Sequence, residues 1–348
     1  MHTIRLERPP ERRDVQIALL AGFMRRVPET KGEPGFRFLG SGKAAIAAVL
    51  GFLRRTGILA SKNSEVLVPQ WLGIPVYQQI TNYAFPVLSC TARTRAVFVY
   101  HQYGFPQDMD RILDFASTNK LTVIEDCAHA ADSFYKNQRL GTLGEYAIYS
   151  FSKFTFCFAL GGVSFRKADF SGYLDSAIKR QPRLLRSAIN LFKLIDEFNL
   201  SDDRPRLPAL MTRGRIAAYS LYGESLAPSN RAIALWAGNG PEELATRRRY
   251  FAHLRDRTRD LGICDHLETM GVAPYAIPVR VPDAKARLLV ARLDEEGIHT
   301  GIYRFDMNRC LLEPNFAPCV LLPCHGGISG AEFDKIVEVV RHASQNAT

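Results

Sequence analysis

The segment VIEDCAHA, residues 123–130, places two acidic residues at the end of a short apolar run. With the two residues before it, the run reads LTVIED (121–126), which is typical of a strand buried on both faces of a parallel sheet. Asp126 therefore ends a predicted interior strand, at the edge where the ligand sites of such sheets gather. A carboxylate buried there needs a partner. That partner is either structural, such as a helix N-terminus or a salt bridge, or it is a cationic nitrogen of a ligand.

Predicted strands and helices alternate on both sides of this segment. The strands are VLVP (66–69), RAVFVY (95–100) and YAIYSF (146–151), and the helices cover residues 44–55 and 109–119. Short apolar strands separated by helices are typical of a parallel sheet that is covered on both faces. The sequence therefore predicts an α/β fold in which a mostly parallel sheet is sandwiched by helices.

The pattern of apolar residues in the last third of the chain predicts a smaller α+β domain. Its predicted elements, in chain order, are a helix over 242–260, a strand over 274–281, a helix over 285–297, a strand over 320–323 and a helix over 331–343. We predict a large domain over residues 1–225 and a small C-terminal domain over residues 226–348. In the large domain, LLRSAINLFKLI (184–195) is amphipathic, which favours packing in the core or against a second copy of the chain over membrane-surface binding.

The 348 residues carry a formal net charge of +10, and 47% of them are hydrophobic, as is ordinary for a globular protein. Much of the excess positive charge lies in residues 166–215. No zinc-finger, RRM or recognition-helix pattern accompanies it, so the sequence predicts no nucleic-acid partner. A solvated basic face or a mouth that attracts phosphate explains the charge instead. The apolar stretch 44–53 is too short for stable membrane insertion and no signal peptide is visible, which predicts a cytoplasmic protein.

Seven cysteines are scattered along the chain without a C-x-x-C pair, which predicts reduced thiols rather than a disulfide framework. Cys319, Cys324 and His325 are close in sequence but lack the spacing of a zinc site. We therefore expect small core side chains at these positions and predict no metal.

The segment GSGK (40–43) precedes the first predicted helix. It does not fit a Walker A loop, which needs Gly at position 37 and Ser or Thr at position 44, where this chain has Arg37 and Ala44. A Gly-Ser-Gly turn before a helix still offers backbone N–H groups and a positive dipole end to a phosphate. A plain junction between loop and helix is the alternative.

Lys153 lies just after the predicted strand 146–151 and is flanked by aromatic residues. Burial near such residues disfavours the charged form of a lysine, which would leave an amine nucleophile. Gly161 and Gly162 follow, and we expect them to form a tight turn. A phosphate-binding turn, an Asp at a buried strand end and a Lys beyond the next strand together describe a site for pyridoxal 5′-phosphate (PLP).

These pieces resemble the DegT/DnrJ/EryC1/StrS family of sugar aminotransferases, which are PLP-dependent enzymes of fold type I. The block from VIEDCAHA (123–130) through LGTLGEYAIYSFSK (140–153) to GGVSF (161–165) is the most specific part. The other matching segments are GSGKAAIAAVLGFL (40–53), SEVLVPQWLGIPV (64–76), VYHQYGFPQDMDRILDFA (99–116), EEGIHTGIYRF (295–305) and VLLPCHGGIS (320–329).

The resemblance implies a role for each matched residue. Lys153 corresponds to the lysine that holds the cofactor covalently, Asp126 to the partner of the pyridine nitrogen, and His129 to a residue beside the cofactor ring. The resemblance assigns Gly42, Lys43, Ala44 and Ser150 to the cofactor's phosphate. Trp71 is either a substitute for the family's stacking aromatic residue or a core residue, and either Asn230 or Ser229 replaces the phosphate contact from the partner subunit.

The resemblance also implies the activity, which is transfer of an amino group from an amino acid, with glutamate as the expected donor, to a nucleotide-linked keto sugar. Such reactions serve the synthesis of surface polysaccharides or secondary metabolites, and the family's enzymes are homodimers with shared active sites. One alternative is a sugar dehydratase that uses pyridoxamine 5′-phosphate and has His in place of Lys153. Another is a catalytically silent binding homologue, because Gly73 replaces the family's stacking aromatic residue and SNRA (229–232) replaces its N-x-R-M motif.

Overall fold

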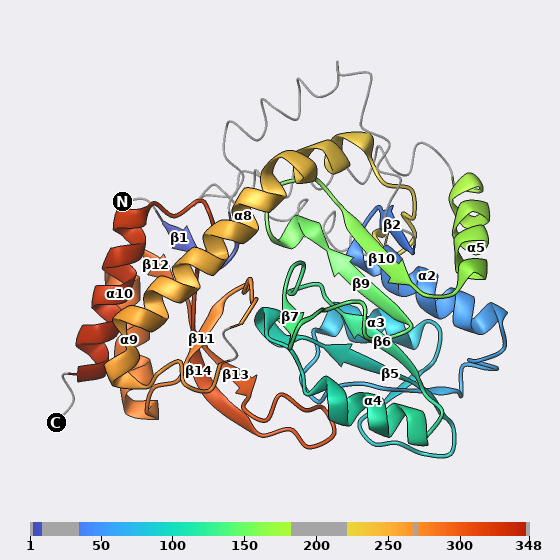
Figure 1. Cartoon of the computed structure of the whole chain (residues 1–348), viewed down its shortest axis with the longest axis horizontal. Helices are drawn as coiled ribbons and strands as arrows, with labels where there is room; N and C mark the ends of the chain where they lie inside the picture. Colours follow the sequence, from blue (N-terminus) through green and yellow to red (C-terminus); the bar gives the residue numbers. More distant parts are fainter. Residues whose placement is uncertain (1–2, 9–34, 182–220, 268–269, 346–348) are drawn as a thin grey trace, which may run out of the picture.

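The computed structural model describes residues 3–8, 35–181, 221–267 and 270–345. Seven of its strands form a central sheet (Figure 1). In sheet order they are β2 (Phe36–Leu39), β10 (Gly161–Phe165), β9 (Tyr146–Ser150), β6 (Thr122–Asp126), β5 (Thr94–Tyr100), β3 (Glu65–Leu67) and β4 (Phe85–Val87). The strands from β9 to β4 are parallel, whereas β10 pairs antiparallel with β9 and with β2. The predicted mostly parallel sheet is therefore confirmed.

Helices cover both faces of this sheet, which is why its strands are apolar without alternation. One face carries α2 (Gly42–Arg55), α3 (Ile74–Thr81) and α5 (Ala168–Lys179), and the other carries α4 (Met109–Thr118). Successive strand residues point to opposite faces. Ile124 and Ile148 pack in the core beside α2, whereas Val123 and Ala147 pack in the core beside α4.

The C-terminal part contains a second, three-stranded antiparallel sheet. Its order is β11 (Ile277–Val279), β14 (Phe316–Leu322) and β13 (Ile302–Asp306). Helix α9 (Asp283–Glu295) packs on this sheet, and α10 (Gly330–Gln345) packs on α9. Helix α8 (Asn230–Arg257) runs from the neighbourhood of β10 to α10 (Figure 1).

The first described residues of the chain lie on this C-terminal part, because β1 (Ile4–Arg5) pairs in parallel with β12 (Ile298–His299). The division into domains at residues 225 and 226 stays a prediction. The remaining short elements of the described chain are β7 (Phe134–Tyr135), β8 (Gln138–Arg139) and the 3-10 turns η1 (Gln102–Gly104), η2 (Phe151–Lys153) and η3 (Arg259–Leu261).

Two local predictions differ from the structure. Helix α8 begins at Asn230 rather than at Glu242, because buried side chains such as Leu235 hold the turns before Pro241 in place. Gly161 and Gly162 do not form a tight turn but lie within β10. A Cβ on Gly161 would collide with the carbonyl group of Ser41, so the glycine allows β10 to pass close to the start of α2.

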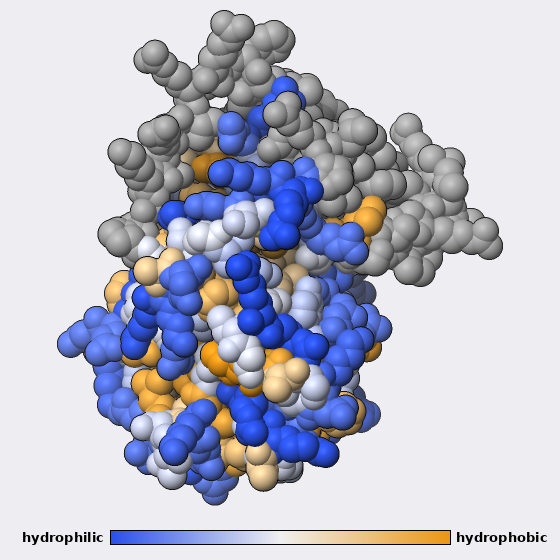
Figure 2. Space-filling view, turned by 90° about the vertical axis from the view of Figure 1, so that its right-hand side faces the viewer, coloured by the Kyte–Doolittle hydropathy of each residue, from blue (hydrophilic) through white to orange (hydrophobic). Residues whose placement is uncertain are grey.

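No helix in the described residues is long and apolar enough to span a membrane. All seven cysteines have free thiols, as predicted. The described part of the face in Figure 2 is largely hydrophilic, with hydrophobic areas between the hydrophilic side chains. The amphipathic segment 184–195 and much of the basic stretch 166–215 lie outside the described residues.

Candidate active site

The carboxyl ends of three neighbouring parallel strands, β5, β6 and β9, bring a short chain of side chains together. Tyr100 is the last residue of β5, His129 follows the end of β6, and Lys153 ends η2 directly after β9. The Lys153 Nζ lies 2.7 Å from the His129 Nε2, and the Tyr100 hydroxyl oxygen lies 2.7 Å from the His129 Nδ1. The structure thus joins two predicted residues directly and adds Tyr100, which sequence reasoning missed.

Asp126 ends β6, as predicted, and its side chain is buried. Its Oδ1 accepts a hydrogen bond of 2.9 Å from the backbone N–H of Ala128. Burial raises the pKa of the Asp126 carboxyl, and the opposing effects of the Ala128 N–H and of the charge of Lys153 are smaller. A cationic nitrogen beside this carboxylate would favour its charged form again. The position therefore suits a carboxylate that pairs with a cationic ligand.

His129 is buried and is in its neutral form near pH 7. Burial lowers the pKa of the His129 imidazole well below its ordinary value, and the positive charges of Lys153 and Arg247 lower it further. A neutral imidazole has one N–H donor and one acceptor nitrogen, so it can donate a hydrogen bond to one neighbour while it accepts one from the other.

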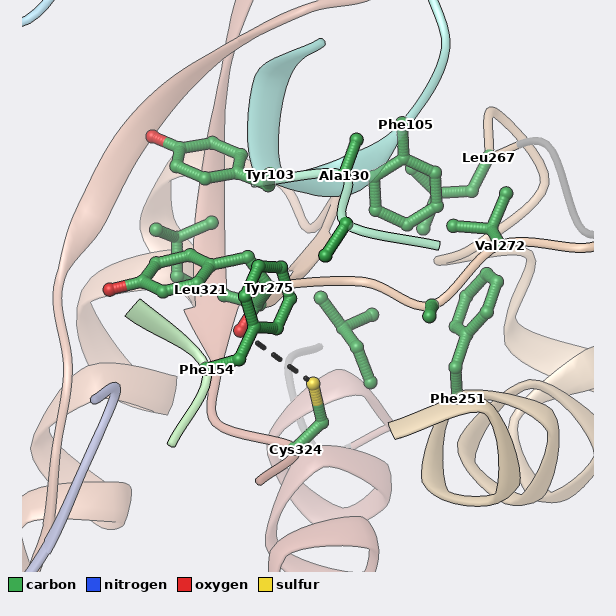
Figure 3. Packing of buried hydrophobic residues seen from close by; sticks show 14 of the residues in the cluster. Tyr103, Phe105, Ala130, Phe154, Phe251, Leu267, Val272, Tyr275, Leu321 and Cys324 are labelled. Atoms are coloured by element: carbon green, nitrogen blue, oxygen red, sulfur yellow. Dashed lines mark hydrogen bonds between the residues drawn. The ribbon is translucent and has the colours of Figure 1, made fainter. Parts of the chain in front are cut away.

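Two tyrosine rings enclose His129. The Tyr275 ring lies parallel to the imidazole, with 4.1 Å between centroids and an interplanar angle of 6°, and the Tyr103 ring stacks at 6.1 Å. Figure 3 shows Tyr103 and Tyr275 in one cluster of buried rings with Phe154, and the Cys324 thiol donates a hydrogen bond to the Tyr275 carbonyl oxygen there. Tyr103 has a φ of 54°, a left-handed conformation that is strained for an aromatic residue. Neither tyrosine was predicted as a site residue.

A buried arginine supports the chain directly after Lys153. Arg247 donates to the carbonyl oxygens of Phe154 (3.3 Å) and Tyr275 (2.6 Å) and pairs with the Glu243 carboxylate at 2.7 Å. The second oxygen of Glu243 accepts from Arg8 at 3.2 Å. We call Arg8, Glu243 and Arg247 the buried charge cluster. Sequence reasoning missed it, because a Glu and an Arg four residues apart on a helix usually form an exposed pair.

The start of α2 lies at the same edge of the sheet. Ser41 caps the helix by accepting a hydrogen bond from the Ala44 N–H at 3.0 Å, and its hydroxyl donates to the Tyr222 carbonyl oxygen at 2.6 Å. A Cβ on Gly42 would come within 2.9 Å of the Ser150 Cβ, so the helix start and the end of β9 touch. Burial lowers the pKa of the half-buried Lys43. Gly42, Ala44 and Ser150 thus meet at a helix N-terminus, which is a ready anion site.

The remaining predicted contacts lie farther out. The Trp71 side chain is 47% exposed, and its ring lies 6.5 Å from that of Phe316 of β14. Gly73, which stands at the family's stacking position, is the N-cap of α3. Asn230 is the exposed first residue of α8. The roles assigned to Trp71 and Asn230 stay predictions.

Cys319, Cys324 and His325 are buried in the C-terminal part. The Cys324 thiol donates to the Pro274 carbonyl oxygen at 3.4 Å, and a ring nitrogen of His325 bonds to the Arg5 carbonyl oxygen at 2.9 Å.

A different group in the described ranges, formed by His101, Glu125 and Cys127, has spacing that would suit a metal ion. The carboxylate of this group is already used, because Glu125 accepts hydrogen bonds from the backbone N–H groups of Gly141, Leu143 and Gly144 and also pairs with His101. These contacts anchor the loop before β9.

Residues 89–167 match the DegT/DnrJ/EryC1/StrS aminotransferase family. The chain is 44% identical over 61 residues to GDP-perosamine synthase of Escherichia coli O157:H7, which covers 18% of this chain and 17% of that protein. It is 46% identical over 61 residues to the dTDP-3-amino-3,6-dideoxy-alpha-D-galactopyranose transaminase of Aneurinibacillus thermoaerophilus, with 18% and 17% covered. The matched stretch therefore spans less than a fifth of the length of these curated relatives.

Solved structures match along the whole chain. The aminotransferase TlmJ from Streptoalloteichus hindustanus aligns with a TM-score of 0.68 and 17% identity, covering 98% of this chain and 99% of that one. The aminotransferase PseC from Helicobacter pylori, involved in the biosynthesis of pseudaminic acid, has a TM-score of 0.69 and 11% identity, covering 99% and 100%. The family resemblance and the α/β fold predicted from the sequence are thus confirmed.

Proposed function

We propose that this chain is a PLP-dependent aminotransferase that moves an amino group from an amino acid to a nucleotide-linked keto sugar. The observation that carries the proposal is the position of Lys153, whose Nζ lies 2.7 Å from a neutral imidazole at the carboxyl edge of the sheet. A lysine held there can take up and release a proton at Nζ, which amine transfer requires. Lys153 also disfavours the dehydratase alternative, which has His at that position.

The residues at this edge fit PLP at both of its ends. The pyridine nitrogen needs a buried anion, and the Asp126 carboxylate is buried with a pKa raised chiefly by desolvation, so a cationic partner would stabilise it. The phosphate needs N–H and hydroxyl donors, which the start of α2 and Ser150 supply side by side. When bound, PLP supplies the electron sink for reactions at the carbon that bears the amine.

The chain's own residues then have distinct tasks. Lys153 holds and moves a proton at Nζ, and His129 fixes the direction of that amine through the 2.7 Å hydrogen bond. The rings of Tyr103 and Tyr275 keep water away from His129. The buried charge cluster holds the backbone after Lys153, so the amine keeps its position through a reaction cycle.

The substrate class rests on the relatives. GDP-perosamine synthase and the dTDP-amino-sugar transaminase are named for nucleotide-linked sugars, and the net charge of +10 suits a substrate with a diphosphate. We extend to this chain the family's expected amino donor, glutamate, and a place in surface-polysaccharide or secondary-metabolite synthesis. We also propose a cytoplasmic homodimer in which residues near Asn230 of one subunit reach the phosphate site of the other.

The test is to load the purified full-length protein with PLP and divide it into two portions. One portion is reduced with borohydride before any amino donor is added, and the visible absorbance of the other is recorded before and after glutamate. We expect the reduced cofactor on the peptide that contains Lys153, and no label in a Lys153→Ala control. The absorbance should change on addition of glutamate, because the amine passes to the cofactor. A label on Lys136 or Lys167 would overturn the assignment of Lys153.

One observation favours a second candidate, a silent cofactor- or sugar-binding homologue. The aromatic residue expected to stack on the cofactor ring is absent at Gly73, and Trp71 packs against Phe316. This candidate predicts that the protein binds PLP on Lys153 but leaves the absorbance unchanged when glutamate is added.

A further inference from the structure

We call the carboxyl edge of the central sheet around Asp126, His129 and Lys153 the active edge. Tyr100 lies at this edge, and neither the family resemblance nor the proposed function assigns a role to it. It ends β5 and lies beside Asp126 in the register of the sheet. Its hydroxyl oxygen is 2.7 Å from the His129 Nδ1, and its ring meets the imidazole edge-on at 5.4 Å between centroids. Tyr100, His129 and Lys153 thus form one continuous line of hydrogen bonds.

The single proton of a neutral imidazole makes this line directional. When Lys153 carries its proton, the ammonium donates to Nε2, so Nδ1 bears the hydrogen and donates to the Tyr100 oxygen. When Lys153 has released that proton, its amine gains a lone pair that can accept from Nε2–H, and in that arrangement Nδ1 accepts from the Tyr100 hydroxyl. Only a group that can both donate and accept satisfies both states, and a phenol hydroxyl is such a group.

The surroundings keep the imidazole from changing partners. The Tyr275 ring lies flat against it, with 4.1 Å between centroids, so rotation of the imidazole out of its plane would require that ring to move. Burial raises the pKa of Tyr100 well above its ordinary value, which keeps the hydroxyl protonated. Among the residues that the structure describes, the other charged or titratable groups that face this line are Asp126, Tyr103, Arg247 and Tyr275, whose hydroxyl donates to Glu7.

We propose that Tyr100 is a positioning residue whose hydroxyl reverses its hydrogen bond to His129 each time Lys153 gains or loses a proton. His129 then keeps its hydrogen bonds to Lys153 and to Tyr100 in both protonation states of the Lys153 amine. The importance of this reversal rests on the proposed function, in which Lys153 moves protons. The linkage itself belongs to the chain and can be measured without the cofactor.

The test compares the cofactor-free full-length protein with its Tyr100→Phe variant, which keeps the ring and removes the hydroxyl. Nitrogen-15 NMR of the His129 ring reports which nitrogen carries the proton. In the native protein we expect Nδ1–H while Lys153 is protonated and a change to Nε2–H as Lys153 is deprotonated at higher pH. In the variant, Nδ1–H would be a buried donor without a partner, so we expect Nε2–H throughout.

The same defect should change the reactivity of Lys153. Because the ammonium form loses its support, acetic anhydride should acetylate Lys153 about tenfold faster at pH 7 in Tyr100→Phe, the effect of one unmade buried hydrogen bond. Tyr146→Phe is the matched control. Tyr146 also has a buried hydroxyl, but unlike that of Tyr100 it has no hydrogen-bond partner in the described structure. We therefore expect its removal to change neither the His129 tautomer nor the acetylation rate of Lys153.

A native tautomer that does not change with pH, or a Tyr100→Phe variant that matches the native protein in both readouts, would overturn the proposal. The native measurement keeps the test decisive even where the variant does not fold. Failure of the proposed function gives a different pattern, with the tautomer change present and no borohydride label on Lys153.

Discussion

The active edge around Lys153 and the buried charge cluster around Arg247 lie next to each other, and both bury titratable or charged side chains. They differ in whether the charged form of the buried group has a partner. In the cluster, Arg247 is bonded to the Glu243 carboxylate and to the carbonyl oxygens of Phe154, Pro274 and Tyr275. At the active edge, burial raises the pKa of Asp126 and lowers that of His129, so the charged form of each group is less favoured than it is in water. A buried charge that is paired, such as that of Arg247, holds its surroundings in place. Groups with displaced pKa values are instead ready to exchange protons or to pair with a ligand.

The strongest way to break this contrast is Asp126→Asn. The amide keeps the size of the side chain but cannot stabilise a cationic pyridine nitrogen. We expect amine transfer to fall on the order of 10²–10³-fold, with PLP still bound and the thermal unfolding midpoint little changed. Steady-state transfer rates and the absorbance of the bound cofactor measure this, and near-native turnover would remove Asp126 from the proposed role.

The next variant, Arg247→Met, tests the buried charge cluster. It leaves the Glu243 carboxylate buried and three carbonyl oxygens with one donor fewer, so we expect the free energy of unfolding to drop by about 3–5 kcal/mol. Urea unfolding measures the drop. The matched control is Arg249→Met on the same helix, whose exposed pair with Glu242 has a separation of 3.7 Å and should change stability by less than about 0.5 kcal/mol. Equal losses in both variants would mean that the buried charge cluster does not support the fold.

The smallest expected effect is on the acid dependence of stability, in the variant Glu125→Gln. Glu125 is next to Asp126 on β6, and its side chain points to the opposite face of the sheet. Burial alone would raise its pKa, but the hydrogen bond and charge of His101 and the N–H groups of Gly144 and Gly141 hold the pKa of Glu125 below its usual value. A carboxyl with a lowered folded-state pKa adds stability above its unfolded pKa of about 4.3, and that stability is lost as the pH falls below it. Urea unfolding at pH 6 and at pH 3.5 should therefore show a smaller acid loss in Glu125→Gln than in the native protein. An equal loss would show that this carboxyl does not govern stability in acid.

The sequence alone predicted the active edge where the signal was local. An apolar run that ends in an acid locates Asp126, and a lysine just beyond the next apolar run locates Lys153, because strand ends follow from short stretches of side chains. The helix that follows the Gly-Ser-Gly turn was predicted in the same way. Its distance from Ser150 was not, since that contact depends on two glycines letting distant segments touch.

By itself, then, the sequence determined that the sheet is mostly parallel, where its apolar strands lie along the chain and which residues end them. Each of these features depends on a few neighbouring side chains. Only the tertiary structure decided that Tyr275 lies flat on His129, that Arg247 binds the backbone after Lys153, and that Tyr100 closes the hydrogen-bond line. Phe154 and Arg247 are 93 positions apart, and no local sequence pattern around either residue predicts their contact. Such pairs exist because folding removes water from buried polar groups, and each group then bonds with whatever partner the packing brings within reach.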